Sequence, residues 1–353
     1  MPITARSWFL VEPRAPLQEH EWELADPAPT EAVIEVWGNG VCHTDLGFAD
    51  GDVRPNRALP LVLGHEAVGR VVAAGSAFTG LTGRIVVVPA VLPCGECELC
   101  ESGHGNACPK QKMPGNDIDG AFSTHMLVPA RALQVVERPG DVDVRLYGVV
   151  ADAVSTAYQT AMRAQVEAGD LVVVVGAGGV GGFAIQVAAA LGAKVVALDV
   201  SEPRLELMAR HGAAATVHTA GKDLRAIRGE VQRHAREWGI EPWRTKILEC
   251  SGQPAAQEAA FALIGRRSVM VQVGFTSAKT NVRLSNLMAF DATIHGSWGC
   301  PPHHYAAVFD LIARGEIALA PFVEIRPMRE VDAVLGEMRA HQLSRRVVLD
   351  PRL

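Results

Sequence analysis

Residues 171–200 read LVVVVGAGGVGGFAIQVAAALGAKVVALDV. An apolar β-branched run is followed by a glycine-rich turn, a helical stretch and a second β-branched run, which together predict one βαβ unit. Three glycines have the G-x-G-x-x-G spacing, which permits a tight turn, lets a pyrophosphate approach the backbone and lets the helix pack on the strand. The stretch therefore predicts a Rossmann domain with phosphates at the helix N-terminus. We expect the dinucleotide to contact Gly176, Gly178, Gly179, Val180 and Gly181.

An acidic residue ends the second β-branched run. Asp199 lies 23 residues after the first glycine of the turn, where a carboxylate accepts hydrogen bonds from the adenosine ribose and repels the extra phosphate of NADP. We therefore expect NAD as the cofactor, although Arg204 would weaken this rejection and a solvated carboxylate is the alternative interpretation of Asp199. Two later runs, Ile247–Gly252 and Val269–Phe275, predict further parallel strands that end at the cofactor edge, with Gly274 as a contact.

Four cysteines fall within fifteen residues and share two-residue and seven-residue gaps. This spacing predicts a closed tetrahedral zinc site that organises a loop and takes no part in the reaction. Two disulfides are the alternative, and they would indicate an oxidising compartment. The N-terminal apolar stretch ends too soon, at Glu12 and Pro13, for a signal peptide, so we expect a reducing cytoplasm. The predicted ligands are Cys94, Cys97, Cys100 and Cys108.

The composition bounds the class of protein. A chain of 353 residues with 48% hydrophobic content can form two domains, and no apolar run reaches the roughly twenty residues that cross a bilayer. The net charge of −6 gives no cationic surface for nucleic acid or for a membrane. We therefore expect a soluble globular protein whose partners are small molecules or further copies of the chain.

A second group of metal-binding residue types precedes the cysteine lobe. The runs Gly40-Val-Cys-His-Thr-Asp45 and Leu63-Gly-His-Glu-Ala67 place a cysteine and a histidine where a catalytic zinc with one open position could use them. Buried packing is the alternative for a lone cysteine or histidine. The spacing does not identify a third ligand.

Taken in order, these motifs resemble the zinc-dependent medium-chain alcohol dehydrogenases over nearly the whole chain. The resemblance implies an α/β protein with a GroES-like β-rich catalytic domain, a doubly wound parallel Rossmann domain and an active site in the cleft between them. The catalytic domain would cover residues 1–150, with its structural zinc lobe at 93–108, and the NAD-binding domain residues 151–298. Residues 299–353 would return to the catalytic domain.

The resemblance also implies roles for individual residues. Cys42 and His65 would bind the catalytic zinc, and Glu66 would be a neighbour able to replace the metal's water transiently. Thr44 would take the substrate proton, and His43 would lie near the cofactor phosphates. With the cysteine lobe, this implies two zinc ions per chain, one catalytic and one structural.

The third ligand of the family precedes a Ser-Thr-x-Tyr helix start, and Asp152 occupies that position in Ala151–Tyr158. A carboxylate in place of a thiolate keeps the charge and hardens the ligand set. The alternative is that Asp152 only caps a helix beginning near Ser155. Gly47 stands where some relatives carry a proton-relaying histidine, so the resemblance assigns no route for the proton.

Longer stretches, among them Val88–Cys100, Gln111–Asp117 and Arg283–Thr293, resemble the 6-hydroxycyclohex-1-ene-1-carbonyl-CoA dehydrogenases within this family. This implies oxidation of the ring alcohol of a cyclic hydroxy-enoyl-CoA with NAD, in anaerobic benzoyl-CoA degradation, with conjugate reduction as a further hypothesis. The motifs specify metal and nucleotide better than substrate, so another secondary or allylic alcohol is the alternative. A nucleotide-binding protein without catalysis is another. Relatives imply a homodimer or homotetramer joined through Val269–Ser277 and Thr293–Trp298.

Overall fold

A computed structural model describes residues 2–137 and 139–353 and separates into two compact units. The first comprises Met1–Ser155, Gly299–Ala313 and Leu319–Leu353, and the second comprises Thr156–Trp298 and Arg314–Ala318. The boundary expected after residue 150 falls five residues before the observed one. Asp152 therefore belongs to the same unit as Cys42 and His65.

The second unit is built on a six-stranded sheet of order β11-β10-β9-β12-β13-β14, in which every pairing is parallel. The βαβ unit predicted over 171–200 is confirmed. All five residues of β9 are buried, which explains why this strand is an unbroken apolar run. The strands are β9 (Leu171–Val175), β10 (Lys194–Asp199), β11 (Ala213–His218), β12 (Thr245–Glu249), β13 (Val269–Gln272) and β14 (Thr293–Gly296).

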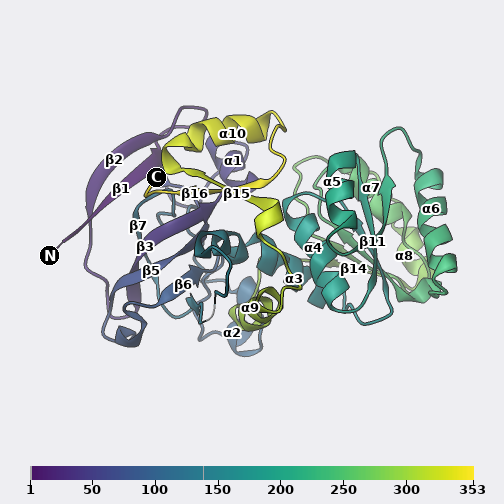
Figure 1. The fold of residues 1–353 in the computed structure, drawn as a ribbon, viewed down its shortest axis with the longest axis horizontal. Coiled ribbons are helices and arrows are strands. Elements are labelled where there is room, and N and C mark those ends of the chain that lie inside the picture. The colour runs from purple at the N-terminus through teal and green to yellow at the C-terminus, as the bar shows by residue number, and fades with distance from the viewer. Residues whose placement is uncertain (1, 138) are drawn as a thin grey trace. The chain divides into compact units, whose positions relative to one another are not determined.

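Helices cover both faces of this sheet. Figure 1 shows α4 and α6 on opposite sides of the strands β11 and β14, as in a doubly wound fold. The sequence of α6 explains its packing: Asp223 caps it by accepting the N–H of Ala226, and Ile227 and Val231, one turn apart, are buried. The helices are α3 (Ala153–Arg163), α4 (Gly179–Ala190), α5 (Glu202–Ala209), α6 (Leu224–Glu237), α7 (Pro254–Ala262) and α8 (Ser285–Phe290).

Two strands of this unit end earlier than the sequence predicts. The run Ile247–Gly252 leaves the sheet after Glu249, and the run Val269–Phe275 leaves it after Gln272. The carboxylate of Glu249 accepts the N–H groups of Ser251 and Gly252 at 2.9 and 3.1 Å, so the backbone turns back on this side chain. The prediction of parallel strands in both runs is confirmed, but their predicted ends were three residues too late, because an apolar run alone does not show where such a turn begins.

The first unit contains a seven-stranded sheet and a three-stranded sheet. The larger sheet has the order β15-β16-β3-β5-β6-β8, with β7 also paired to β3, and only the pairing of β15 with β16 is parallel. The smaller sheet has the order β2-β1-β4 and is antiparallel. The strands are β1 (Ile3–Leu10), β2 (Gln18–Leu24), β3 (Glu31–Gly40), β4 (Leu61–Val62), β5 (Glu66–Ala74), β6 (Ile85–Val88), β7 (His125–Pro129), β8 (Gln134–Val135), β15 (Val323–Pro327) and β16 (Arg346–Asp350).

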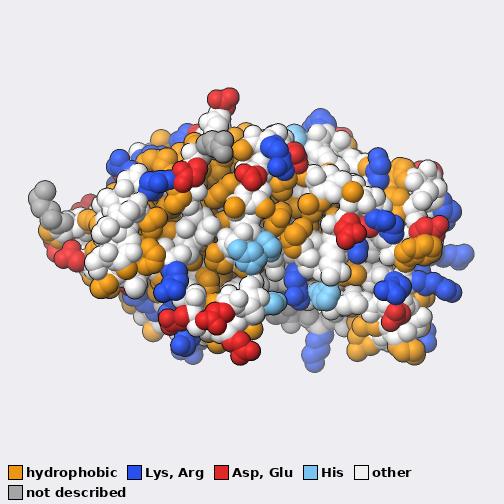
Figure 2. Space-filling model, turned by 90° about the horizontal axis from the view of Figure 1, so that it is seen from below, with side chains coloured by type: hydrophobic (Ala, Val, Ile, Leu, Met, Phe, Trp, Pro, Cys, Tyr) orange, Lys and Arg blue, Asp and Glu red, His pale blue; other side chains and the backbone are white. Residues whose placement is uncertain are grey.

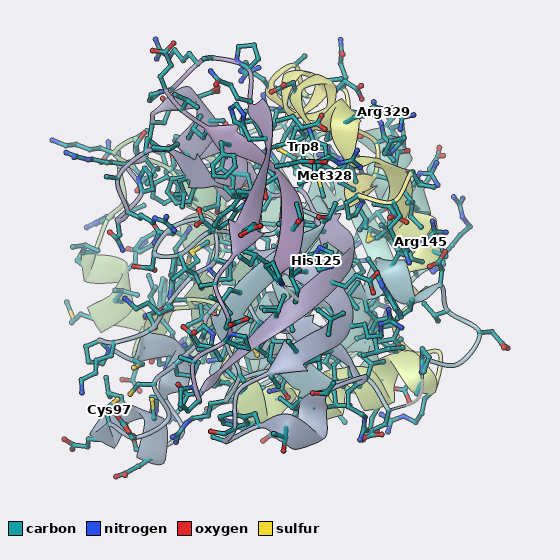
Figure 3. The ribbon with its side chains drawn as sticks, turned by 90° about the vertical axis from the view of Figure 1, so that its left-hand side faces the viewer. Trp8, Cys97, His125, Arg145, Met328 and Arg329 are labelled. Atoms are coloured by element: carbon teal, nitrogen blue, oxygen red, sulfur yellow. The ribbon has the colours of Figure 1, made fainter. Side chains whose placement is uncertain are left out.

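Both ends of the chain contribute to the core of this unit. Trp8, from β1, and Met328, which follows β15, belong to one buried apolar cluster and are labelled in Figure 3, with Cys97 well away from them. The β-rich unit and the parallel unit together confirm the predicted fold class. In the part of the chain that the structure describes, no helix combines the length and hydropathy needed to cross a bilayer. The helices of the first unit are α1 (His43–Asp50), α2 (Glu98–Glu101), α9 (Tyr305–Ala313) and α10 (Val331–Arg339).

Candidate metal centres and nucleotide site

Three segments far apart in the sequence bring Cys42, His65 and Asp152 together. Cys42 precedes the first residue of α1, His65 immediately precedes β5, and Asp152 immediately precedes α3. Asp152 Oδ2 lies 3.6 Å from His65 Nε2 and 3.8 Å from Cys42 Sγ. The geometry therefore places the Asp152 carboxylate toward the predicted ligands, as the Cys/His/Asp interpretation requires.

The donor atoms of this group fit a zinc ion. In a tetrahedral site with metal–ligand distances of about 2.0 to 2.3 Å, the N···O and S···O separations are about 3.4 and 3.6 Å, close to the observed values. His65 Nε2 is buried and has no hydrogen-bond partner, as expected of a nitrogen that needs a metal. The ligand atoms of Cys42, His65, Glu66 and Asp152 all lie within 4.8 Å of one another. A thiolate, an imidazole and a carboxylate are the ligand types that zinc accepts.

Asp45, which is not among the predicted site residues, orients His65. This carboxylate is fully buried; its Oδ1 accepts the N–H of Gly64 at 3.0 Å and lies 3.2 Å from His65 Nδ1. Its Oδ2 accepts the N–H of Cys42 at 2.9 Å, as the third helical residue does in a capping box. With His65 Nδ1–H donating to Asp45, Nε2 presents its lone pair to a metal. One carboxylate thus holds both the cysteine and the histidine segments.

Charged neighbours also determine the protonation of His65. Burial opposes a proton on this ring, but Asp45, Asp152 and Cys42 outweigh burial, so the pKa of His65 lies well above its ordinary value. A group of acidic residues around a protonated histidine is a site that favours a cation. A metal ion would displace that proton.

Glu66 lies beside the three predicted ligands and is fully buried. Burial raises its pKa to about 7, although the ion pair with the buried Arg346 opposes this shift. The second carboxylate oxygen, Oε2, has no hydrogen-bond partner. A Cβ atom at Gly40 would lie 2.0 Å from that oxygen, which explains why glycine occupies position 40. Glu66 therefore has one oxygen held by Arg346 and one available to a metal or its water.

The other predicted catalytic residues lie on the first turn of α1. The hydroxyl of Thr44 is half-buried and 3.8 Å from Cys42 Sγ, within reach of a ligand on the same metal. His43 is the first residue of α1, and its side chain is exposed. Gly47, on the next turn of α1, has no side chain that could relay a proton.

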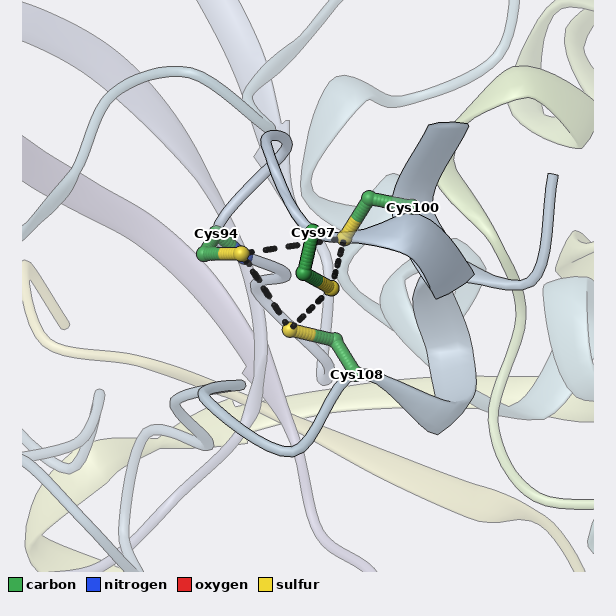
Figure 4. A group of neighbouring side chains, drawn as sticks. All are labelled: Cys94, Cys97, Cys100 and Cys108. Carbon is green, nitrogen blue, oxygen red and sulfur yellow. Dashed lines mark hydrogen bonds between the residues drawn. The ribbon is translucent and has the colours of Figure 1, made fainter. Parts of the chain in front are cut away.

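The four-cysteine lobe forms the second predicted metal site (Figure 4). Four pairs of its sulfur atoms are separated by 3.4 to 3.9 Å, and a zinc tetrahedron with Zn–S bonds of about 2.3 Å has edges of about 3.8 Å. These separations exceed the S–S bond of about 2.05 Å, and all seven cysteines are free. The backbone N–H of Glu96 lowers the pKa of Cys94 to about 7, whereas burial raises that of Cys100 to about 12. Four thiolates this close need a cation between them.

The glycine turn between β9 and α4 has the backbone that its spacing predicts. Gly176 has a φ of +91°, and a Cβ atom at Gly181 would lie 1.7 Å from the carbonyl oxygen of Gly176. Gly178 precedes the helix, and a Cβ atom there would meet nothing within 4 Å. Gly179 and Val180 form the first turn of α4. Gly181 therefore allows the turn to close, while the open space at Gly178 lets a phosphate approach.

Asp199 ends β10 and holds the glycine turn. Its carboxylate accepts the N–H of Ala177 at 2.7 Å and that of Ser201 at 2.8 Å, one on each oxygen. Each oxygen keeps a second acceptor position for a ribose hydroxyl. Arg204 is the third residue of α5, five residues after Asp199, and is half-buried.

Glu249 is a second functional residue that is not among the predicted site residues. It is fully buried at the end of β12, where Oε1 accepts the Ser251 hydroxyl at 2.7 Å and Oε2 accepts Gln272 Nε2 at 2.7 Å. A Cβ atom at Gly274 would lie 2.2 Å from the nitrogen of Gly252. Glu249 thus ties together the turns that follow β12 and β13 at the carboxyl edge of the sheet, where such folds bind nucleotides.

The chain is similar to known proteins over most of its length. Residues 28–139 match the alcohol dehydrogenase GroES-like domain, and residues 179–314 match the zinc-binding dehydrogenase model. An alcohol dehydrogenase of Rhizobium meliloti is 30% identical over 339 residues, which is 95% of each chain. The chain belongs to the zinc-dependent alcohol dehydrogenase family.

Other members of this family agree in extent and fold. An alcohol dehydrogenase of Geobacillus stearothermophilus is 29% identical over 322 residues, 90% of this chain and 91% of that one. The cobalt- and zinc-bound thermostable alcohol dehydrogenase of Pyrobaculum aerophilum is 26% identical, with a TM-score of 0.85 over 99% of this chain and all of that chain. Membership of this family confirms the prediction that the chain is an oxidoreductase.

Two residues of this dehydrogenase could have been found from the sequence. Asp45 stands three residues after Cys42, at the capping-box position of a helix start. Glu249 is the one charged residue within the apolar run Ile247–Cys250, where a strand-end carboxylate indicates a turn or a ligand.

Proposed function

We propose that this chain is an NAD-dependent alcohol dehydrogenase with a catalytic zinc on Cys42, His65 and Asp152 and a structural zinc on the four-cysteine lobe. The observation that carries the proposal is the convergence of a thiol, an imidazole and a carboxylate, with His65 Nε2 buried and without a hydrogen bond. Thr44 lies beside them, where it can reach a substrate hydroxyl. The site has the acid–base and ligand groups that alcohol oxidation requires.

When bound, zinc would supply Lewis acidity that lowers the pKa of the alcohol, and NAD would accept the hydride. The residues of the chain then have distinct tasks. Thr44 would take the hydroxyl proton of the substrate while it passes its own hydroxyl proton to water, and Asp45 keeps His65 in the tautomer that binds metal. Glu66 has one oxygen held by Arg346 and one without a hydrogen-bond partner, and the second oxygen would be available to a metal at this site.

The nucleotide is held by the second unit. We assign the pyrophosphate to the Gly176–Gly181 turn and the N-terminus of α4, and the adenosine ribose to the free acceptor positions of Asp199. A carboxylate at this position favours NAD over NADP, because the ribose phosphate of NADP would face a negative charge. Arg204 is near enough in sequence to lessen that preference.

For the substrate, we propose the ring alcohol of 6-hydroxycyclohex-1-ene-1-carbonyl-CoA, which would be oxidised to the 6-oxo compound. The support is the resemblance of the runs Val88–Cys100, Gln111–Asp117 and Arg283–Thr293 to those of that enzyme group. Lys110, Lys112 and Arg283 are exposed and are candidates for contacts with the phosphates of coenzyme A. Hydride delivery to the ring alkene in the reverse direction is a further possibility of the same chemistry.

Formation of NADH by the zinc-replete protein tests this substrate. The cyclic hydroxy-enoyl-CoA is compared with cyclohexanol and with an allylic alcohol that lacks the thioester. Turnover of the thioester alone is the expected result. Turnover of free alcohols without the thioester would reject the CoA substrate and keep the zinc dehydrogenase. With deuterated NADH, deuterium found only on the carbinol carbon would reject conjugate reduction.

Two further proposals concern partners and location. β14 is the edge of the parallel sheet, and Trp298 and Met288 near it are 56% and 80% exposed, which favours pairing of two copies through this edge. On the face shown in Figure 2, acidic and basic side chains are interspersed, which suits small-molecule partners better than nucleic acid. Free cysteines favour a reducing compartment, the cytoplasm.

Light scattering of the wild type and of the Met288→Glu variant tests the pairing of two copies through the β14 edge.

A further inference from the structure

The peptide that carries Asp152 is held from the far end of the sequence. The carbonyl oxygen of Ala151 accepts the hydroxyl of Tyr305 at 2.7 Å and the N–H of Ala90 at 3.1 Å. Asp152 itself has φ −135° and ψ −69°, outside the helical region, so α3 does not fix its orientation from within. The direction of the Asp152 side chain therefore depends on what holds the preceding carbonyl.

Ser155 completes this network. Its hydroxyl lies 3.1 Å from the Tyr305 hydroxyl, 3.2 Å from the Asp152 carbonyl oxygen and 3.3 Å from the Ala151 carbonyl oxygen. Both Tyr305 and Ser155 are fully buried, so water does not compete for these groups. The Tyr305 hydroxyl donates to the Ala151 carbonyl oxygen and can accept from the Ser155 hydroxyl, so its hydrogen-bonding capacity is satisfied.

The segment before Tyr305 gives this residue a rigid base. Pro301 and Pro302 precede it and restrict the backbone, and Tyr305 is the first residue of α9. Pro302 packs near the four-cysteine lobe, because a Cβ atom at Gly105 would lie 3.8 Å from Pro302 Cδ. Tyr305 is thus placed by a loop that the structural metal would order.

We propose that Tyr305 is a positioning residue for the catalytic metal: through the Ala151 carbonyl and Ser155 it holds the Asp152 carboxylate toward Cys42 and His65. It would act through these two groups and is not itself one of the proposed ligands. Metal ligands must lie within about 0.2 Å of their ideal distances, so a small rotation of the 151–152 peptide weakens the site. This inference rests on the proposed function, because it requires a metal on Asp152.

Tyr305→Phe tests the inference, with Tyr147→Phe as a matched control. Tyr147 is equally buried in the same unit, but its hydroxyl donates to the carbonyl oxygen of Pro139 at 3.4 Å instead of to that of Ala151. Cobalt(II) is loaded into the catalytic site while zinc stays in the cysteine lobe, and the d–d absorption bands are recorded. Zinc loss from each site to a chelator is measured separately.

Tyr305→Phe should shift the cobalt bands and lower the zinc affinity of the catalytic site about tenfold, so that this site loses zinc to the chelator sooner than in wild type. The zinc of the cysteine lobe in Tyr305→Phe should be lost at the same rate as in wild type. The cobalt spectrum of Tyr147→Phe should match that of wild type. Unchanged bands and zinc loss in Tyr305→Phe, or equal changes in both variants, would overturn the inference. A wild-type protein that binds only the lobe zinc would instead refute the proposed function.

Ser155→Ala provides a second test if Tyr305→Phe does not fold. It removes one donor from the same network and leaves the tyrosine ring in place. The cobalt bands should shift in the same direction by a smaller amount, and unchanged bands would again contradict the positioning role.

Discussion

Replacing Asp45 by asparagine tests the support of the metal ligands most sharply. Asp45 Oδ1 faces two N–H donors, on Gly64 and His65, and Oδ2 faces the N–H of Cys42. An amide has one acceptor oxygen, so in its better orientation the new NH2 group opposes the Cys42 N–H. A buried donor left without a partner costs about 1 to 3 kcal/mol of folding free energy.

The same change weakens the hold on His65. The bond from His65 Nδ1–H to a charged carboxylate becomes a bond to a neutral amide, roughly half as strong. Loss of such an outer ligand contact typically lowers metal affinity about 10- to 100-fold, or about 1.4 to 2.7 kcal/mol. We expect Asp45→Asn to bind zinc at the catalytic site about 10- to 100-fold more weakly than wild type and to keep the zinc of the cysteine lobe.

Zinc affinity is measured by competition with a chromogenic chelator, and folding free energy by urea unfolding of the zinc-loaded protein. Asp350→Asn is the matched control, because Asp350 is equally buried in the same unit but pairs with Arg145 and Arg352. It should destabilise the fold and leave catalytic zinc affinity unchanged. Equal zinc affinity in Asp45→Asn and wild type would refute the orienting role of Asp45.

Three further predictions concern protonation, the nucleotide turn and the cysteine lobe. The pKa of His65 is raised, so zinc must displace a proton from this ring. The zinc affinity of the catalytic site should therefore fall as the pH falls, and the fall should begin above the ordinary histidine pKa of 6.5. Zinc competition at several pH values checks this, and a zinc affinity that does not change with pH would contradict it. A Cβ atom at Gly178 meets no atom within 4 Å, so Gly178→Ala should keep wild-type stability but weaken NADH binding about tenfold. Gly181→Ala should weaken NADH binding and also destabilise the second unit, because its Cβ atom would meet the Gly176 carbonyl oxygen. NADH fluorescence titration measures the binding, and thermal unfolding measures the stability. Cys97→Ser should lose the lobe zinc and lower the melting temperature, and a variant that unfolds like wild type would contradict a structural role for that zinc.

The parallel unit was predictable because its strongest determinants are local. The β9–α4–β10 unit follows from apolar runs and glycine spacing within thirty consecutive residues, and its bounds match the prediction closely. The ends of β12 and β13 were not predictable from apolar periodicity, because a side-chain contact of Glu249 decides where the backbone turns.

The metal ligands were partly predictable for a similar reason. The cysteine lobe has its ligands in one short run, whereas the catalytic group draws on three segments that only the fold brings together. Asp152 was found through a family resemblance, and its supporting residues Tyr305 and Ser155 lie 150 positions apart. No local pattern connects residues at such separation.

The zinc content of the purified chain tests the central claim most directly, with a Cys42→Ser, Asp152→Ala double variant measured beside it. Two zinc ions per wild-type chain and one in the double variant are the predicted result, because only the four-cysteine lobe would remain. One zinc in the wild-type chain, or two in the double variant, would contradict a catalytic metal on Cys42, His65 and Asp152.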